Sequence, residues 1–166
     1  LDLTNPTSIE SCTTLIQSLN KPIDILINNA GIWSGIDDNP TISVDLLRRV
    51  IEVNLFGTIN FTERIIPIIN RGGHIVNISS RMGSLELCDE FGTNWPDYKI
   101  SKCALNMVTR ILADRLKDKI TVSSVHPGWV KTDMGGDDAD ISSAESAKDI
   151  FTLAVSRPES GQFWYK

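Results

Sequence analysis

The stretch "IDILINNAG" (residues 23–31) carries the clearest indication of the fold. Its first five residues form a short, largely apolar run with β-branched side chains, which is typical of a strand buried on both faces of a parallel sheet. The next four, "NNAG" (28–31), are good turn formers. Small side chains and a glycine also let the backbone approach a flat or phosphorylated ligand closely. The segment is therefore open to two interpretations, a plain turn and a binding loop.

Working outward from this stretch, strand-like and helix-like patterns alternate along the chain. Further strands are predicted where short apolar runs recur, at 74–79, 120–125 and 161–166. Helices are predicted where apolar residues recur at helical spacing, from a cap at Thr4 or Asn5 to about Leu19, and over 43–69, 96–116 and 142–155. This alternation predicts an α/β fold with a doubly wound parallel sheet of the Rossmann type. In such folds the ligand lies at the carboxyl ends of the strands.

The composition excludes several functional classes. The chain has 166 residues, of which 41% are hydrophobic and 22% charged, as in one soluble globular domain. A net charge of -5 gives no reason to expect nucleic acid or an anionic membrane as a partner. No segment reaches the ~20 apolar residues that span a bilayer. The three cysteines lack a CxxC pair and the two histidines lack ligand spacing, so no metal site is expected and a reducing, cytoplasmic location is favoured.

Polar or turn-forming residues follow two of the predicted strands. Ser79 and Ser80 come at the end of the strand "HIVNIS". The segment "HPGWVKTDM" (126–134) follows the next strand, and its Pro-Gly pair forces a sharp turn after which Val130 and Thr132 could face a ligand. Taken alone, each feature is explained more simply by an ordinary cap or turn.

Asn54 interrupts the apolar pattern of the predicted helix 43–69. Asparagine is unfavourable inside a helix unless its polar groups or a local distortion serve a purpose. Gly57, three residues later, weakens the helix further. A solvent-facing asparagine is the alternative, although the apolar neighbours argue against it.

The stretch "NWPDYKISK" (94–102) places Tyr98 and Lys102 four residues apart on one helical face. A free tyrosine titrates near ~10, and an adjacent ammonium group is expected to lower that pKa. Such a tyrosine can exchange a proton with a carbonyl or hydroxyl group, while a serine from a neighbouring strand end holds the same oxygen. The alternative is a tyrosine packed on the sheet beside a solvated lysine.

These motifs occur in one order along the whole chain, and together the sequence resembles the short-chain dehydrogenase/reductase family. The segment "HPGWVKTDMGGDDA" (126–139) is similar to the carbonyl-reductase-like and C-factor-like branch, whose members typically use NADPH. The resemblance implies reduction of a carbonyl to an alcohol, or the reverse, with NADP(H) favoured over NAD(H) and a small carbonyl or alcohol as substrate. A homodimer or homotetramer through 43–69 and 96–117 is also implied.

The resemblance assigns a role to each motif. Tyr98 is implied as general acid/base, Lys102 as the residue that lowers its pKa and holds the nicotinamide ribose, Ser80 as the group that orients the substrate, and Asn54 as the holder of a water molecule. The cofactor is implied to contact Asp2, Leu3, Asn29, Ala30, Gly31, Tyr98, Lys102, Pro127, Gly128, Val130 and Thr132. Residues 85–95 could form a wall of the substrate pocket or simply cap the following helix.

One departure from the family pattern is large, because the glycine-rich run that cradles the pyrophosphate does not occur in these residues. We therefore expect residues 1–166 to be a single partial NAD(P)-binding domain, incomplete at the N-terminus and also at the C-terminus, that is inactive alone. Two alternatives to the reductase are a non-catalytic relative with a binding or regulatory role and a short-chain epimerase or dehydratase.

Overall fold

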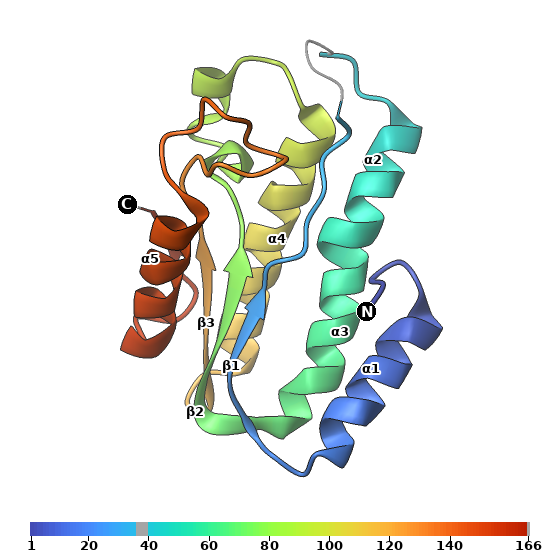
Figure 1. Ribbon diagram of the computed structural model, residues 1–166, viewed down its shortest axis with the longest axis vertical. Coiled ribbons are helices and arrows are strands. Elements are labelled where there is room, and N and C mark those ends of the chain that lie inside the picture. Colours follow the sequence, from blue (N-terminus) through green and yellow to red (C-terminus); the bar gives the residue numbers. More distant parts are fainter. Residues whose placement is uncertain (36–39, 166) are drawn as a thin grey trace.

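The computed structural model describes residues 1–35 and 40–165. In this part of the chain four parallel strands pair in the order β1-β2-β3-β4 (Figure 1). Their bounds are Ile23–Asn28 (β1), Ile69–Ile78 (β2), Ile120–Val125 (β3) and Phe163–Trp164 (β4). The register aligns Leu26 with Ile75 and Ile75 with Val122, so the carboxyl ends of β1, β2 and β3 meet at one edge of the sheet.

Helices cover both faces of this sheet, which confirms the predicted doubly wound architecture. The α-helices are Pro6–Ser18 (α1), Val44–Ile51 (α2), Thr58–Ile65 (α3), Pro96–Arg115 (α4) and Ser143–Ser156 (α5). Shorter helical turns are the π-helical Glu52–Gly57 (η1) and the 3₁₀ turns Ile66–Ile68 (η2), Arg81–Gly83 (η3) and Cys88–Phe91 (η4). In Figure 1, α5 lies on one side of the sheet, α3 and α4 lie on the other, and α1 packs against α3.

The core forms where apolar strand residues meet these helices. On one face Ile75 and Val122 pack with Ile65 of α3 and Leu112 of α4. On the other face a smaller cluster, which includes Val76 and Val125, packs beneath Ala154 of α5. Burial of apolar surface contributes roughly 25 cal/mol per Å², so these two layers hold the strand ends in fixed positions.

Two expectations about individual elements are wrong in part. β1 lies at the edge of the described sheet and Ile27 is 40% exposed, so β1 is not buried on both faces. The predicted helix 43–69 ends earlier, because Pro67 has no N–H and the chain passes through η2 into β2 at Ile69. The connection between β2 and α4 contains the short turns η3 and η4.

Candidate active site

Tyr98 and Lys102 lie one turn apart on α4, beside the carboxyl end of β2. The Lys102 Nζ atom is 5.4 Å from the centroid of the Tyr98 ring. Lys102 is only 3% exposed, and its ammonium group donates to the carbonyl oxygen of Ile78 at 2.8 Å. This bond ties the helix to the last residue of β2, so the fold decides where the lysine sits.

Burial controls the protonation of both groups. It lowers the pKa of Lys102 to about 8. It also raises the pKa of Tyr98 above 10.0, and a hydrogen bond with Ser80 opposes this shift. The direction of the Tyr98 pKa in this structure is thus opposite to the expected lowering, because the effect of burial exceeds that of the hydrogen bond with Ser80. Tyr98 is protonated at neutral pH.

Ser80 is the member of the serine pair that faces Tyr98. Its buried hydroxyl group hydrogen-bonds with the tyrosine side chain and accepts from the N–H of Met82 at 3.1 Å, which starts η3. Ser79 instead donates to Asn106 Oδ1 at 2.7 Å. The Ser80 and Tyr98 oxygens thus meet at one point, where both could contact the same carbonyl oxygen.

Asn54 lies in the π-helical turn η1 and is 1% exposed, so it does not face solvent. Its Oδ1 accepts from the N–H of Ile32 at 2.7 Å, and its Nδ2 donates to the carbonyl oxygen of Ile32 at 2.8 Å and to Ser101 Oγ at 3.0 Å. Ser101 in turn donates to the carbonyl oxygen of Tyr98 at 2.7 Å. Asn54 therefore joins the loop after β1 to α4.

Ser101 is a residue that sequence reasoning missed. It is fully buried and links Asn54 to the Tyr98 backbone. A serine within a helix is common in sequences, and only the tertiary contact with Asn54 distinguishes this one.

Gly31 lies against the same groups. A Cβ atom at this position would be 3.3 Å from Lys102 Nζ and 3.5 Å from Asn54 Oδ1. The absence of a side chain lets the loop approach the ammonium group closely and leaves its surface open. Asn29 and Ala30, just before it, are exposed. Gly31, Asn54, Ser80, Tyr98 and Lys102 thus form one cluster.

Asp2 and Leu3 lie outside this cluster. Asp2 is exposed, and its carboxylate accepts from the N–H and the hydroxyl group of Thr4, which lowers its pKa. Leu3 packs on η1, where its carbonyl oxygen lies 2.3 Å from the position that a Cβ of Gly57 would take. The lack of a side chain at Gly57 therefore lets the N-terminal segment approach η1 closely.

The loop after β3 forms a further part of the same edge of the sheet. The carbonyl oxygen of Pro127 accepts from Ser146 Oγ at 2.7 Å, and Gly128 takes a φ of 88°. Val130 forms a bridge with Ile141, while the Thr132 hydroxyl group donates to the carbonyl oxygen of Val130 at 3.3 Å. These contacts hold the loop to the start of α5 and leave Thr132 exposed.

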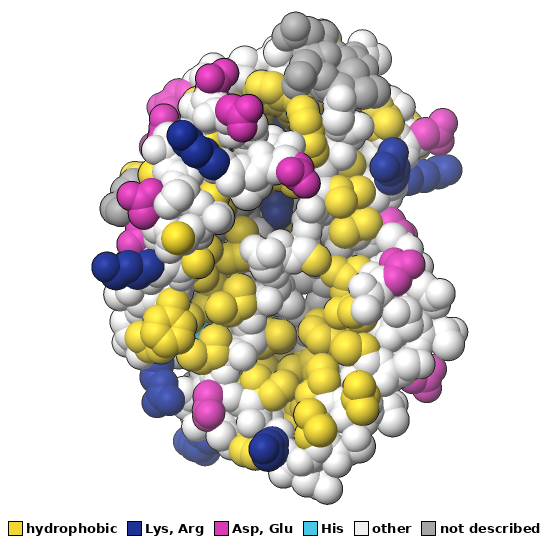
Figure 2. Space-filling model, in the orientation of Figure 1, with side chains coloured by type: hydrophobic (Ala, Val, Ile, Leu, Met, Phe, Trp, Pro, Cys, Tyr) yellow, Lys and Arg dark blue, Asp and Glu magenta, His cyan; other side chains and the backbone are white. Residues whose placement is uncertain are grey.

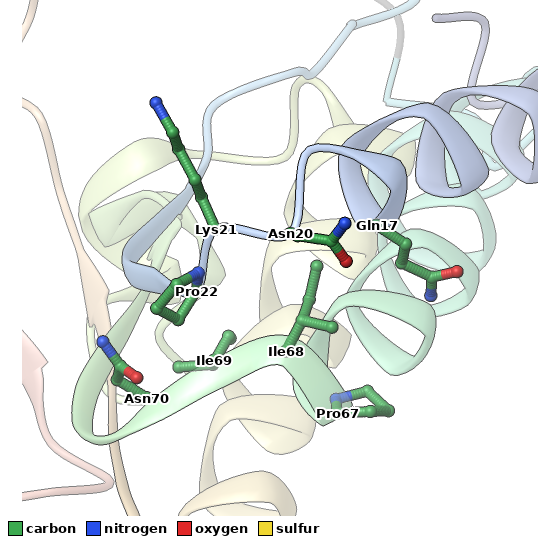
Figure 3. A pocket seen from close by; sticks show the side chains of 8 residues that line it. All are labelled: Gln17, Asn20, Lys21, Pro22, Pro67, Ile68, Ile69 and Asn70. Carbon is green, nitrogen blue, oxygen red and sulfur yellow. The ribbon is translucent and has the colours of Figure 1, made fainter.

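A separate hollow of about 280 Å³ lies at the other end of the sheet (Figure 3). It is lined by the end of α1 and the start of β2, with Gln17, Asn20 and Ile68 among its residues.

In the space-filling view a recess above the hydrophobic area of this face has a basic side chain in its depth (Figure 2). None of the helices in residues 1–35 and 40–165 is long and apolar enough to span a membrane.

The family profile described as short chain dehydrogenase matches residues 1–142. The chain belongs to the short-chain dehydrogenase family. This confirms the resemblance seen in the sequence. The chain is 32% identical to C-signal of Myxococcus xanthus over 151 residues, which cover 86% of this chain and 88% of that protein. It is 29% identical to carbonyl reductase [NADPH] 3 of Rattus norvegicus, over 96% of this chain and 72% of that one.

A solved structure of the family shows the same fold. NADPH-bound carbonyl reductase from chicken fatty liver superposes with a TM-score of 0.88 at 29% identity. The match covers 99% of this chain and 72% of that chain. The chain is thus a member of an oxidoreductase family whose similar proteins include NADPH-dependent carbonyl reductases.

Proposed function

We propose that this protein is an NADP(H)-dependent reductase that converts a carbonyl to an alcohol. The observation that carries the proposal is the contact of a protonated Tyr98 with Ser80 beside the buried Lys102, at the carboxyl ends of the strands. A cytoplasmic location remains part of the proposal, because the three cysteines are free thiols.

The cluster fits a nicotinamide cofactor because Gly31 has no side chain to cover the Lys102 ammonium group. That group has three N–H donors, of which the carbonyl oxygen of Ile78 accepts one. When bound, the cofactor supplies the hydride. The residues proposed to hold it are Asp2, Leu3, Asn29, Ala30, Gly31, Tyr98, Lys102, Pro127, Gly128, Val130 and Thr132. The names of the similar carbonyl reductases support NADPH rather than NADH.

Each residue of the cluster then has a definite task. The Ser80 hydroxyl group holds the substrate oxygen beside the Tyr98 hydroxyl group, and Tyr98 gives that oxygen a proton as negative charge develops on it. The positive charge of Lys102 stabilises the phenolate that remains. Asn54 holds the loop that contains Gly31 and Ile32 in place.

Substitution Tyr98→Phe in the full-length protein tests this function. We expect carbonyl turnover to fall by about 10²–10⁴-fold, the usual contribution of general acid catalysis, while NADPH binding measured by fluorescence stays unchanged. Tyr165→Phe is the matched control, because Tyr165 is the other of the two tyrosines and is exposed. A Tyr98→Phe protein that keeps full activity would disprove the proposed mechanism.

A binding or regulatory role is the second candidate, and the relative named C-signal supports it. The two candidates differ in one measurement. A regulatory protein would turn over no member of a carbonyl panel, whereas a reductase would do so and lose that activity with Tyr98→Phe.

We also propose that the protein dimerises through 43–69 and 96–117. Both segments present exposed apolar side chains to solvent, including Phe56, Met107 and Ile111. Exposed apolar residues of this size on neighbouring helices favour a protein partner. Sedimentation of the full-length protein and of Met107→Lys tests this, and a monomeric unsubstituted protein would contradict it.

A further inference from the structure

Lys99, next to Tyr98 on α4, is a buried lysine that the proposed chemistry does not use. It is 8% exposed, and lysine is rarely so buried because removing an ammonium group from water is unfavourable unless it is paired. Its Nζ donates to the carbonyl oxygen of Phe91 at 3.2 Å and to that of Gly92. The side chain therefore fastens the end of η4 to the first turn of α4.

The backbone that Lys99 holds has an uncommon conformation. Gly92 has φ 59° and ψ −158°, a region open essentially to glycine alone, and Trp95 has a φ of 56° directly before α4. Such conformations persist only where surrounding contacts hold them. The ammonium group of Lys99 supplies two of those contacts, so it stabilises this form of the segment 84–95, here called the pocket loop.

The pocket loop also meets the loop after β1. The ring centroids of Trp33 and Trp95 are 6.5 Å apart with planes tilted by 56°. Trp33 follows Ile32, which Asn54 holds by both backbone groups, and Trp95 lies three residues before Tyr98. In Figure 1 the olive segment between β2 and α4 rises above the carboxyl ends of the strands. Two tryptophan rings are thus fixed on loops that flank the tyrosine.

We propose that Lys99 is a positioning residue that determines substrate preference. By tying the pocket loop to α4 it makes Trp33 and Trp95 one wall for the organic substituent of the carbonyl. Tryptophan rings bury large apolar areas against other rings, so the enzyme prefers ring-bearing carbonyls over small aliphatic ones. This inference rests on the proposed reductase function.

The test compares acetophenone with 2-butanone, two methyl ketones that differ in the ring. In full-length Lys99→Met we expect KM for acetophenone to rise about tenfold with kcat little changed, as for the loss of a binding contact, while kcat/KM for 2-butanone changes less than about twofold. Lys99→Arg keeps the charge and restores the preference. Lys117→Met is the control, since that lysine is 71% exposed beyond the other end of α4.

Hydrogen exchange gives an independent measurement. It also distinguishes a local change in the pocket loop from a variant that is unfolded as a whole. Backbone amides of 84–95 exchange faster in Lys99→Met and in Lys99→Gln, while those of β2 and β3 do not. In the Lys99→Met background, Trp33→Leu has little further effect on the preference, because both changes remove the same wall.

Equal losses with both ketones, or unchanged exchange in the pocket loop, would overturn this inference while leaving the reductase function intact. An unsubstituted protein that turns over neither ketone nor any other carbonyl would overturn the proposed function, and the role of Lys99 in preference with it.

Discussion

At the scale of single residues, the buried side chain of Asn54 makes three hydrogen bonds inside the protein. It pairs with both backbone groups of Ile32 and with Ser101, all around a side chain that solvent does not reach. A buried polar group that loses its partner costs about 1–3 kcal/mol. The loss of stability on removing the Asn54 side chain can therefore be predicted from these hydrogen bonds.

We expect Asn54→Ala to lower the free energy of unfolding by about 1–3 kcal/mol and to reduce turnover, because Ile32 and Ser101 lose their partner. Urea unfolding and steady-state assays measure the two effects. Asn60→Ala is the control, since Asn60 accepts only an exposed bond from Arg64 in the described contacts. A loss of stability no larger than that of the control would show that these bonds are unimportant.

The pH dependence of the reaction also belongs to single residues. In the proposed mechanism, reduction needs the protonated Tyr98, whose pKa is raised above 10.0, together with the charged Lys102, whose pKa is about 8. Reduction measured as kcat/KM should thus be flat near neutral pH and fall as pH rises through about 8, where Lys102 loses its proton. Alcohol oxidation needs the phenolate and should rise with pH. A Lys102→Arg protein should lack the fall near pH 8, and an unchanged fall in it would contradict this assignment.

At the scale of elements, the π-helical turn η1 joins two functions in one segment. It turns Asn54 inward, and its Gly57 receives the backbone of Leu3. Extra residues of this kind in a helix are frequent at functional sites because they re-aim side chains. The glycine that sequence reasoning took for a weak point in the helix is a packing requirement.

The substitution Gly57→Ala distinguishes two opposing effects on stability, the higher helix propensity of alanine and the lack of space for its methyl group. Alanine favours a helix over glycine by about 1 kcal/mol, whereas forcing a methyl group into a filled space costs about 1–3 kcal/mol. The carbonyl oxygen of Leu3, 2.3 Å from the added Cβ, has to move, so we expect a net loss of stability. If Asp2 and Leu3 hold NADPH as proposed, its binding should weaken as well. Glu52→Ala, at an exposed position of the same turn, serves as control. A more stable Gly57→Ala protein would refute the packing argument.

At the scale of the whole molecule, His74 lies where two layers of the fold join. His74 donates through Nδ1 to the carbonyl oxygen of Ala154 in α5 and accepts from Ser123 in β3, so it connects a helix to the sheet. Burial lowers the pKa of His74 and lowers that of His126 to about 4. Both rings are therefore neutral in the folded protein at neutral pH.

Acid should destabilise the fold for this reason. Between pH 6.5 and about 4, His126 is protonated in the unfolded protein and neutral in the folded protein. The free energy of unfolding therefore falls as pH falls through this window. Urea titrations from pH 7.5 to 4.5 measure the slope, and His126→Gln should reduce it. An equal slope in that variant would mean that other groups cause the acid sensitivity.

The sequence by itself determined the order of strands and helices, the parallel sheet and the family. Apolar periodicity and turn residues are local. The motifs at 28–31, 80 and 127–128 each follow a predicted strand, and the motif at 98–102 lies in a predicted helix. The sequence also indicated that Asn54 serves a purpose, because a polar residue in an apolar helix is visible without coordinates. The chemistry of the Tyr98–Lys102 pair suggested proton transfer, and the resemblance to the family assigned the individual roles.

Only the tertiary structure decided which neighbours those residues have. Burial depends on segments far apart in the chain, so the direction of the Tyr98 pKa, the edge position of β1 and the inward side chain of Lys99 could not be read locally. Ser101 and Gly57 likewise acquire meaning from Asn54 and Leu3, which come from other parts of the chain. Periodicity reports which face of an element is apolar, whereas packing decides what that face meets.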